Sequence, residues 1–95
     1  MTDTDQFWDS YYNMVDELCE EWNLVQSVIR EVYSNEDMSI ERIELPKNKN
    51  EFFFEIIWGD YEDLDRPLRT HMTRIFSTAD KIEDIYDTLK NLIIM

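Results

Sequence analysis

Hydrophobic residues in the first third of the chain recur at steps of three or four, the spacing of one helix face. We therefore predict a helix over the first 33 residues, with a break near residues 21–23 into two shorter helices as the alternative. The predicted apolar face consists of Phe7, Tyr11, Met14, Leu18, Trp22, Val25, Ile29 and Val32. The polar run at 34–37 is expected to end the helix.

The middle of the chain has the alternation and the β-branched and aromatic residues that are typical of strands. Residues 38–45 and 51–58 are predicted strands, joined by a polar loop at 46–50. In the second strand, Phe52, Phe54, Ile56 and Trp58 share one face, and Phe53, Glu55 and Ile57 share the other. Gly59 ends this strand, and an acidic loop follows at 60–65.

The last third begins with an ambiguous segment, because residues 68–76 fit either a helix that starts at Pro67 or a third strand. We favour the strand, since the run from Ser77 to Asp80 has the spacing of a capping box at a new helix start. That last helix has an apolar stripe of Ile82, Ile85, Tyr86, Leu89, Leu92 and Ile93. Residues 1–95 are thus predicted to form a single small α+β domain of order α-β-β-β-α, with a short antiparallel sheet and helices on at least one face.

Charge changes the picture, because 22 acids stand against nine bases and give a formal net charge of −13. Residues 1–65 hold 18 acids and four bases, whereas residues 66–95 hold four acids and five bases. Such a surface repels DNA, RNA and anionic lipid, so we expect no direct nucleic-acid or membrane binding. An acidic N-terminal segment unlike a signal peptide and a lone cysteine favour the cytoplasm, which is the host cytoplasm if the protein is phage-encoded.

The composition also limits the chemistry. One glycine excludes a glycine-rich phosphate loop, and one cysteine with one histidine supplies too few ligands for a structural zinc site. The acidic loop lacks the glycine and glutamate positions of an EF-hand. His71 has no predicted catalytic partner, and anions around Cys19 suppress its thiolate. We predict no enzyme activity, no catalytic residue, no metal and no cofactor.

Acidic residues of the first helix form the most specific pattern. Positions 5, 9, 16 and 20 fall within about 60° on a helical wheel, and residues four apart rise about 6 Å along the axis. That step is close to the separation of successive phosphates on one nucleic-acid strand. A row of carboxylates at this spacing could occupy the basic groove of a nucleic-acid-binding protein; a plain solvated helix face is the alternative.

In overall character the chain resembles the small acidic nucleic-acid mimics encoded by phages: anti-restriction proteins, uracil-DNA glycosylase inhibitors and anti-CRISPR proteins. The resemblance rests on size, acidity, the carboxylate-lined helix and the scarcity of glycine, and not on a shared motif. It implies an inhibitor that binds a basic nucleic-acid-binding protein or nuclease complex. The near-neutral C-terminal third departs from this character.

The predicted partner-binding residues lie on the first helix and in the acidic loop: Asp5, Asp9, Asp16, Glu17, Glu20, Glu21, Asp60, Glu62, Asp63 and Asp65. Tyr12 and Tyr61 are candidate aromatic anchors. Phe53 and Ile57 are a possible apolar interface if both helices cover the opposite face of the sheet. Alternative functions are an immunity protein or antitoxin against a basic toxin, and an acidic adaptor or secretion chaperone; a monomer and a homodimer both fit.

Overall fold

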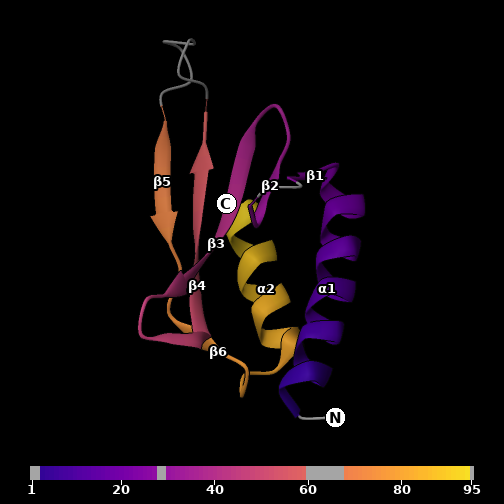
Figure 1. Cartoon of the computed structure of the whole chain (residues 1–95). Helices are drawn as coiled ribbons and strands as arrows, with labels where there is room; N and C mark the ends of the chain where they lie inside the picture. Colours follow the sequence, from indigo (N-terminus) through magenta and orange to yellow (C-terminus); the bar gives the residue numbers. More distant parts are fainter. Residues whose placement is uncertain (1–2, 28–29, 60–67, 95) are drawn as a thin grey trace.

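The computed structural model describes residues 3–27, 30–59 and 68–94, and it has the predicted α+β class (Figure 1). Along the chain, one helix precedes the strands and the other follows them. The elements in order are α1 (Asp3–Trp22), β1 (Val25–Gln26), β2 (Val32–Ser34), β3 (Met38–Leu45), β4 (Asn48–Trp58), β5 (Arg69–Met72), β6 (Phe76–Ser77) and α2 (Ile82–Ile93).

All strand pairs in the sheet are antiparallel, in the order β1-β2-β3-β4-β5, and β6 also pairs with β4. The predicted strand at 38–45 is confirmed as β3. The predicted strand at 51–58 is confirmed as part of β4, which begins earlier. The ambiguous segment at 68–76 contains β5 and the start of β6, so the favoured strand assignment holds.

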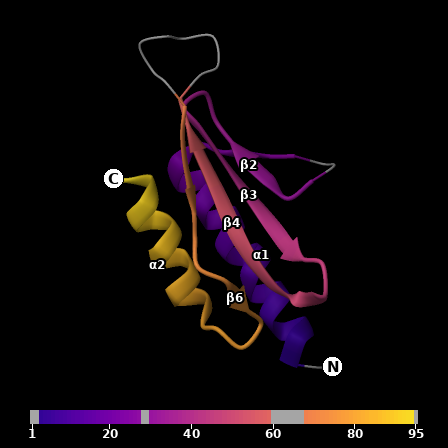
Figure 2. The same ribbon diagram turned by 90° about the vertical axis from the view of Figure 1, so that its left-hand side faces the viewer.

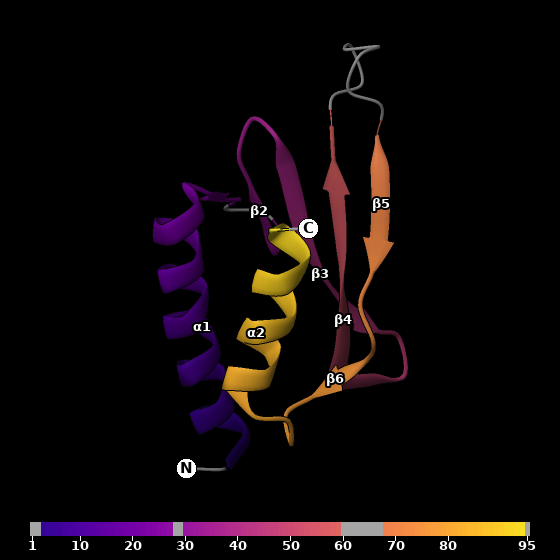
Figure 3. The ribbon, with the colours of Figure 1, turned by 180° about the vertical axis from the view of Figure 1, so that it is seen from behind.

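Both helices cover the same face of the sheet, as views from the side and from behind show (Figures 2 and 3). Phe52, Phe54 and Ile56 alternate with exposed or half-buried neighbours along β4, and all three pack into one core with the helices. The core residues from the helices are Phe7, Tyr11, Met14, Val15 and Leu18 of α1 and Ile85, Leu89 and Leu92 of α2. The opposite face of the sheet, which we call the open sheet face, has no helix among the described residues.

The prediction of a helix over the first 33 residues is wrong beyond Trp22. Asn23 has a left-handed backbone conformation (φ 57°), and the Leu24 amide donates to the Cys19 carbonyl at 2.9 Å. This is the hydrogen bond of a Schellman motif, which ends a helix and turns the chain. Val25 then lies in β1 and is 72% exposed, and Val32 lies in β2, while Ile29 is outside the described residues.

Three predicted boundaries also change. Of residues 34–37, Ser34 ends β2 and 35–37 form the turn between β2 and β3, where the Asn35 side chain accepts hydrogen bonds from the Asp37 and Met38 amides. The expected loop at 46–50 shrinks to a turn at 46–47, because Asn48 already pairs with Leu45. The expected capping box forms a turn in which the Asp80 carboxylate accepts from the Ser77 amide at 2.7 Å, but α2 starts later, after Lys81.

A buried polar cluster joins α1 to the sheet. The Arg42 side chain in β3 is only 6% exposed, and its guanidinium lies 4.6 Å from the centre of the Trp8 ring and 5.3 Å from that of Tyr11. Its charge is compensated by Glu31, at 3.6 Å. Stacking on aromatic faces and pairing with a carboxylate together stabilise a guanidinium that has left water.

Glu31 also accepts hydrogen bonds from tyrosine hydroxyls of this cluster. The Tyr33 hydroxyl donates to one oxygen at 2.6 Å, and the Tyr12 hydroxyl donates to the other at 3.0 Å. The Tyr11 and Tyr33 hydroxyls are 2.9 Å apart, so Tyr11 donates to Tyr33, whose own proton is given to Glu31. Since Tyr11 and Tyr33 are fully buried, these bonds satisfy polar groups that water cannot reach.

We predict that Tyr33→Phe lowers the free energy of unfolding by about 1–3 kcal/mol, because it leaves the Tyr11 hydroxyl buried without its partner. Urea denaturation measures this loss. The matched control is Tyr12→Phe, which removes a hydroxyl from the same carboxylate but at an exposed site, and it should cost less than about 0.5 kcal/mol. Equal losses for the two variants would contradict the buried cluster.

The same cluster predicts alkaline destabilisation. Burial raises the pKa of Tyr11 and of Tyr33 above the ordinary value near 10. Above about pH 10 the unfolded chain therefore releases protons that the folded chain retains, so the stability falls as the pH rises. Urea denaturation at pH values between about 9 and 11 checks the sign of this slope. A stability that is constant or rising over this range would contradict it.

Candidate functional site

Acidic side chains line the side of α1 that faces away from the sheet. All six predicted partner-binding residues of this helix are exposed: Asp5, Asp9, Asp16, Glu17, Glu20 and Glu21. Four of them, Asp5, Asp9, Asp16 and Glu20, lie opposite the buried stripe that includes Tyr11 and Leu18, so the core fixes their orientation. Glu17 and Glu21 lie on the flank of α1 that borders α2. Along a helix of 20 residues, about 30 Å in length, this produces an ordered row of carboxylates rather than a flexible acidic tail.

In the described ranges, basic residues leave most of this row without a neutralising partner. Ion pairs join Arg42 to Glu31 and Glu44, and Arg74 to Asp80, and none of these pairs includes an acid of α1. Within the described part of the chain, Asp9, Asp16, Glu17 and Glu20 have no ion-pair partner. These carboxylates are therefore available to cations from another molecule.

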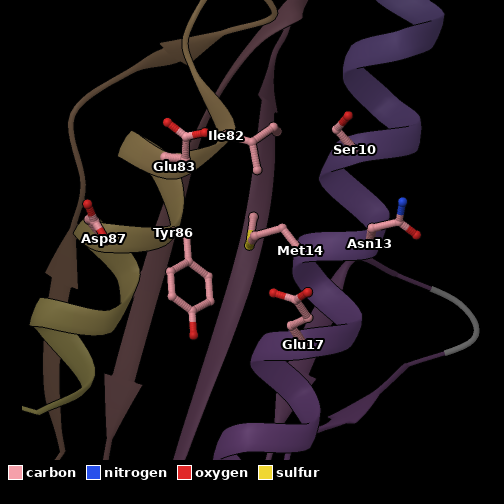
Figure 4. A pocket seen from close by; sticks show the side chains of 8 residues that line it. All are labelled: Ser10, Asn13, Met14, Glu17, Ile82, Glu83, Tyr86 and Asp87. Carbon is pink, nitrogen blue, oxygen red and sulfur yellow. The ribbon is translucent and has the colours of Figure 1, made fainter.

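A groove of about 350 Å³ separates α1 from α2 on the outer side of the helical layer (Figure 4). Met14 and Ile82 give it an apolar floor, and the carboxylates of Glu17, Glu83 and Asp87 belong to its lining. Ser10, Asn13 and Tyr86 complete the lining. The groove thus combines apolar surface with negative charge, which suits the methylene stem and charged head of a lysine or arginine.

Tyr86 connects the two helices at this groove. Its hydroxyl donates to the Glu21 carboxylate of α1 in a short hydrogen bond. That bond raises the pKa of Tyr86 to about 12, with smaller contributions from burial and from the charges of Glu21, Glu17 and Asp87. The hydroxyl therefore stays protonated at neutral pH and holds one carboxylate of α1 against α2.

The structure adds acids that the sequence analysis did not assign to the site. Glu83, Asp84 and Asp87 of α2 are exposed on the same helical layer as the row of α1. The C-terminal third is close to neutral as a whole: of its described bases, Arg69 lies in β5 and Arg74 between β5 and β6, whereas Lys81 and Lys90 lie at the two ends of α2. The spacing of Glu83 and Asp87, four residues apart on a helix, was the available signal. We call the exposed acids of α1 and α2 the carboxylate face.

The other predicted site residues have different outcomes. Asp60, Glu62, Asp63 and Asp65, with Tyr61, lie outside the described residues. Tyr12 is 38% exposed and donates to Glu31, so it borders the carboxylate face next to the buried cluster. Phe53 and Ile57 lie half-buried on the open sheet face, on the other side of the sheet from both helices.

The remaining candidates show no reactive arrangement. His71 is exposed in β5 and pairs through its backbone with Ile56. Cys19 is half-buried, and burial together with the Asp16 charge raises the pKa of its thiol. Among the described residues, no group of three or more histidine, cysteine, aspartate or glutamate side chains is placed to hold a metal ion.

Comparisons with protein-family models, with curated proteins and with solved structures find no match to this chain. In the described ranges, neither helix combines the length and the apolar character that crossing a membrane requires.

The carboxylate face predicts that salt stabilises the fold, because Asp9, Asp16, Glu17 and Glu20 have no ion-pair partner among the described residues. Raising NaCl from about 0.01 M to about 0.1 M shortens the Debye length from about 30 Å to about 10 Å and screens the repulsion between the acids. We expect the melting temperature to rise over this range. The variant with Asp9→Asn, Asp16→Asn and Glu20→Gln should have a smaller rise, because it carries three fewer charges on α1. A melting temperature that falls, or an unchanged response in this variant, would contradict the prediction.

Proposed function

We propose that this protein inhibits a basic nucleic-acid-binding protein or a nuclease complex by presenting carboxylates in the place of phosphates. The observation that carries the proposal is the row of exposed acids on α1, whose members Asp9, Asp16 and Glu20 have no ion-pair partner among the described residues.

The helix supports the mimicry by its spacing and its rigidity. Asp5 and Asp9, and likewise Asp16 and Glu20, are four residues apart and rise about 6 Å along α1, near the spacing of successive phosphates. Glu83 and Asp87 repeat this spacing on α2, which contacts α1. A preformed array loses little conformational entropy when it binds, so each charge contact contributes more to the affinity.

Net charge supports the choice of partner. A formal charge of −13 repels nucleic acid itself but accelerates the encounter with a basic groove. The carboxylate face offers neither a base edge to read nor a phosphodiester bond to cut. A nuclease or a reader protein that accepts this face in its groove is therefore occupied without turnover.

Charge reversal tests the proposal. The protein is immobilised, a bacterial lysate is passed over it, and the retained protein is purified for kinetic measurements. We expect Asp9→Lys, Asp16→Lys and Glu20→Lys each to lower the association rate about fivefold or more at low salt, with a smaller effect at high salt. These exposed positions do not touch the core, so the free energy of unfolding should change by less than about 0.5 kcal/mol.

The matched control is Glu36→Lys, which makes the same charge change at an exposed residue of the turn between β2 and β3. It should lower the association rate much less than the α1 variants do. Equal losses would indicate attraction by the net charge alone, and no loss from the α1 variants would contradict the mimicry.

A further inference from the structure

Apolar side chains gather on the open sheet face, away from the carboxylate face. The pairing register of β3 and β4 places Ile43 beside Phe53. Ile57, four residues after Phe53 in β4, lies on the same face. Met72 of β5 lies on this face as the cross-strand partner of Glu55 and is 60% exposed. Leu68 borders it, because it lines a pocket together with Ile57. The apolar surface therefore extends over three adjacent strands.

Two carboxylates occupy the middle of this surface. Glu41 and Glu55 are direct cross-strand partners in β3 and β4. Side chains in such positions have Cβ atoms about 4.5–5.5 Å apart, and like charges placed there destabilise a sheet. Neither side chain has a hydrogen-bond or ion-pair partner within the described residues. A cation between them would relieve the repulsion.

The charges of Glu41 and Glu55 limit the kind of partner that can bind this face. A second copy of this chain packed face to face would bring four glutamates into one interface between two molecules of charge −13. A partner that carries a lysine or arginine within an apolar surface meets both requirements at once. The open sheet face lacks the helical layer that covers its other side, and a helix is the element that commonly packs on a sheet face.

We propose that the open sheet face binds an amphipathic helix of another protein whose apolar stripe is interrupted by one arginine or lysine. The cation lies between Glu41 and Glu55, and the apolar residues of the helix contact Ile43, Phe53, Ile57 and Met72. This site is separate from the carboxylate face, so the open sheet face can bind a second protein while the carboxylate face binds the nucleic-acid-binding partner. If no helix binds the open sheet face, the proposed inhibition is unaffected.

The probe is a synthetic amphipathic helix of about 18 residues, about 27 Å long, with one arginine at the centre of a leucine stripe. Two matched peptides carry leucine or glutamate at that position, and a third has the arginine peptide's composition in scrambled order. Amide chemical shifts of the whole protein are followed during titration. We expect the arginine peptide to shift residues of β3, β4 and β5 on the open face, with weaker binding of the leucine peptide and none of the glutamate or scrambled peptides.

Substitution of the pair gives the decisive comparison. In Glu41→Gln with Glu55→Gln, binding of the arginine peptide should weaken about tenfold, while binding of the leucine peptide changes less than about twofold. The melting temperature of this variant should rise, because the repulsion is removed, so a loss of binding cannot come from unfolding.

Four results would overturn the proposal. Shifts confined to α1 and α2 would show attraction to the carboxylate face, and shifts confined to β5 would show a strand added at the sheet edge. Self-association that Phe53→Asp abolishes would show that a second copy occupies this face. Absence of binding by the arginine peptide would also contradict it.

Discussion

The packing of α1 on the sheet through Arg42 is the interaction on which the rest of the structure depends. The sequence of α1 contains seven acids and no base, and Glu20 and Glu21 lie at its C-terminal end, where the helix dipole disfavours negative charge. Charge alone therefore opposes this helix. The aromatic rings of Trp8 and Tyr11 hold it in place, because they cover the guanidinium of Arg42 from β3, which Glu31, the residue before β2, anchors.

This arrangement separates the molecule into two surfaces of different chemistry. All the large aromatic side chains of the described core lie between the helices and the sheet, so the outer side of the helices is left to acids. The open sheet face is left with half-buried apolar residues and the Glu41–Glu55 pair. A small core thus supports a carboxylate face and an apolar face on opposite sides.

Local patterns were sufficient to predict the elements whose signal is local. Alternation located β3 without error, and the period of Ile85, Leu89 and Leu92 located α2. The helix end was missed because Val25 and Val32 happen to continue the helical period, while the decisive event is a single residue, Asn23, in a left-handed conformation. Strands of two or three residues such as β1 and β2 have no period to detect. They form because β3 supplies hydrogen-bond partners to β2, and β2 supplies them to β1.

The candidate site, like the fold, could be predicted from the sequence only where its signal is local. The row on α1 follows from helix spacing, and all its described members are exposed. Helix spacing could place Glu83 and Asp87 on one side of α2, but it could not show that they adjoin the row on α1, because that depends on α2 packing beside α1 rather than on the other face of the sheet. Likewise, no local signal pairs Arg42 with Glu31 or with the rings of α1, since these contacts arise only when the chain is folded.

The claim that the carboxylate face replaces phosphates is tested most directly by asking whether the protein and nucleic acid exclude each other from one partner. The captured partner is mixed with a fluorescent duplex or single strand that it binds, and the protein is titrated in while fluorescence anisotropy is recorded. The account predicts full displacement, with an apparent Kd for the nucleic acid that rises in proportion to the concentration of the protein. A ternary complex that contains partner, nucleic acid and protein together would contradict it.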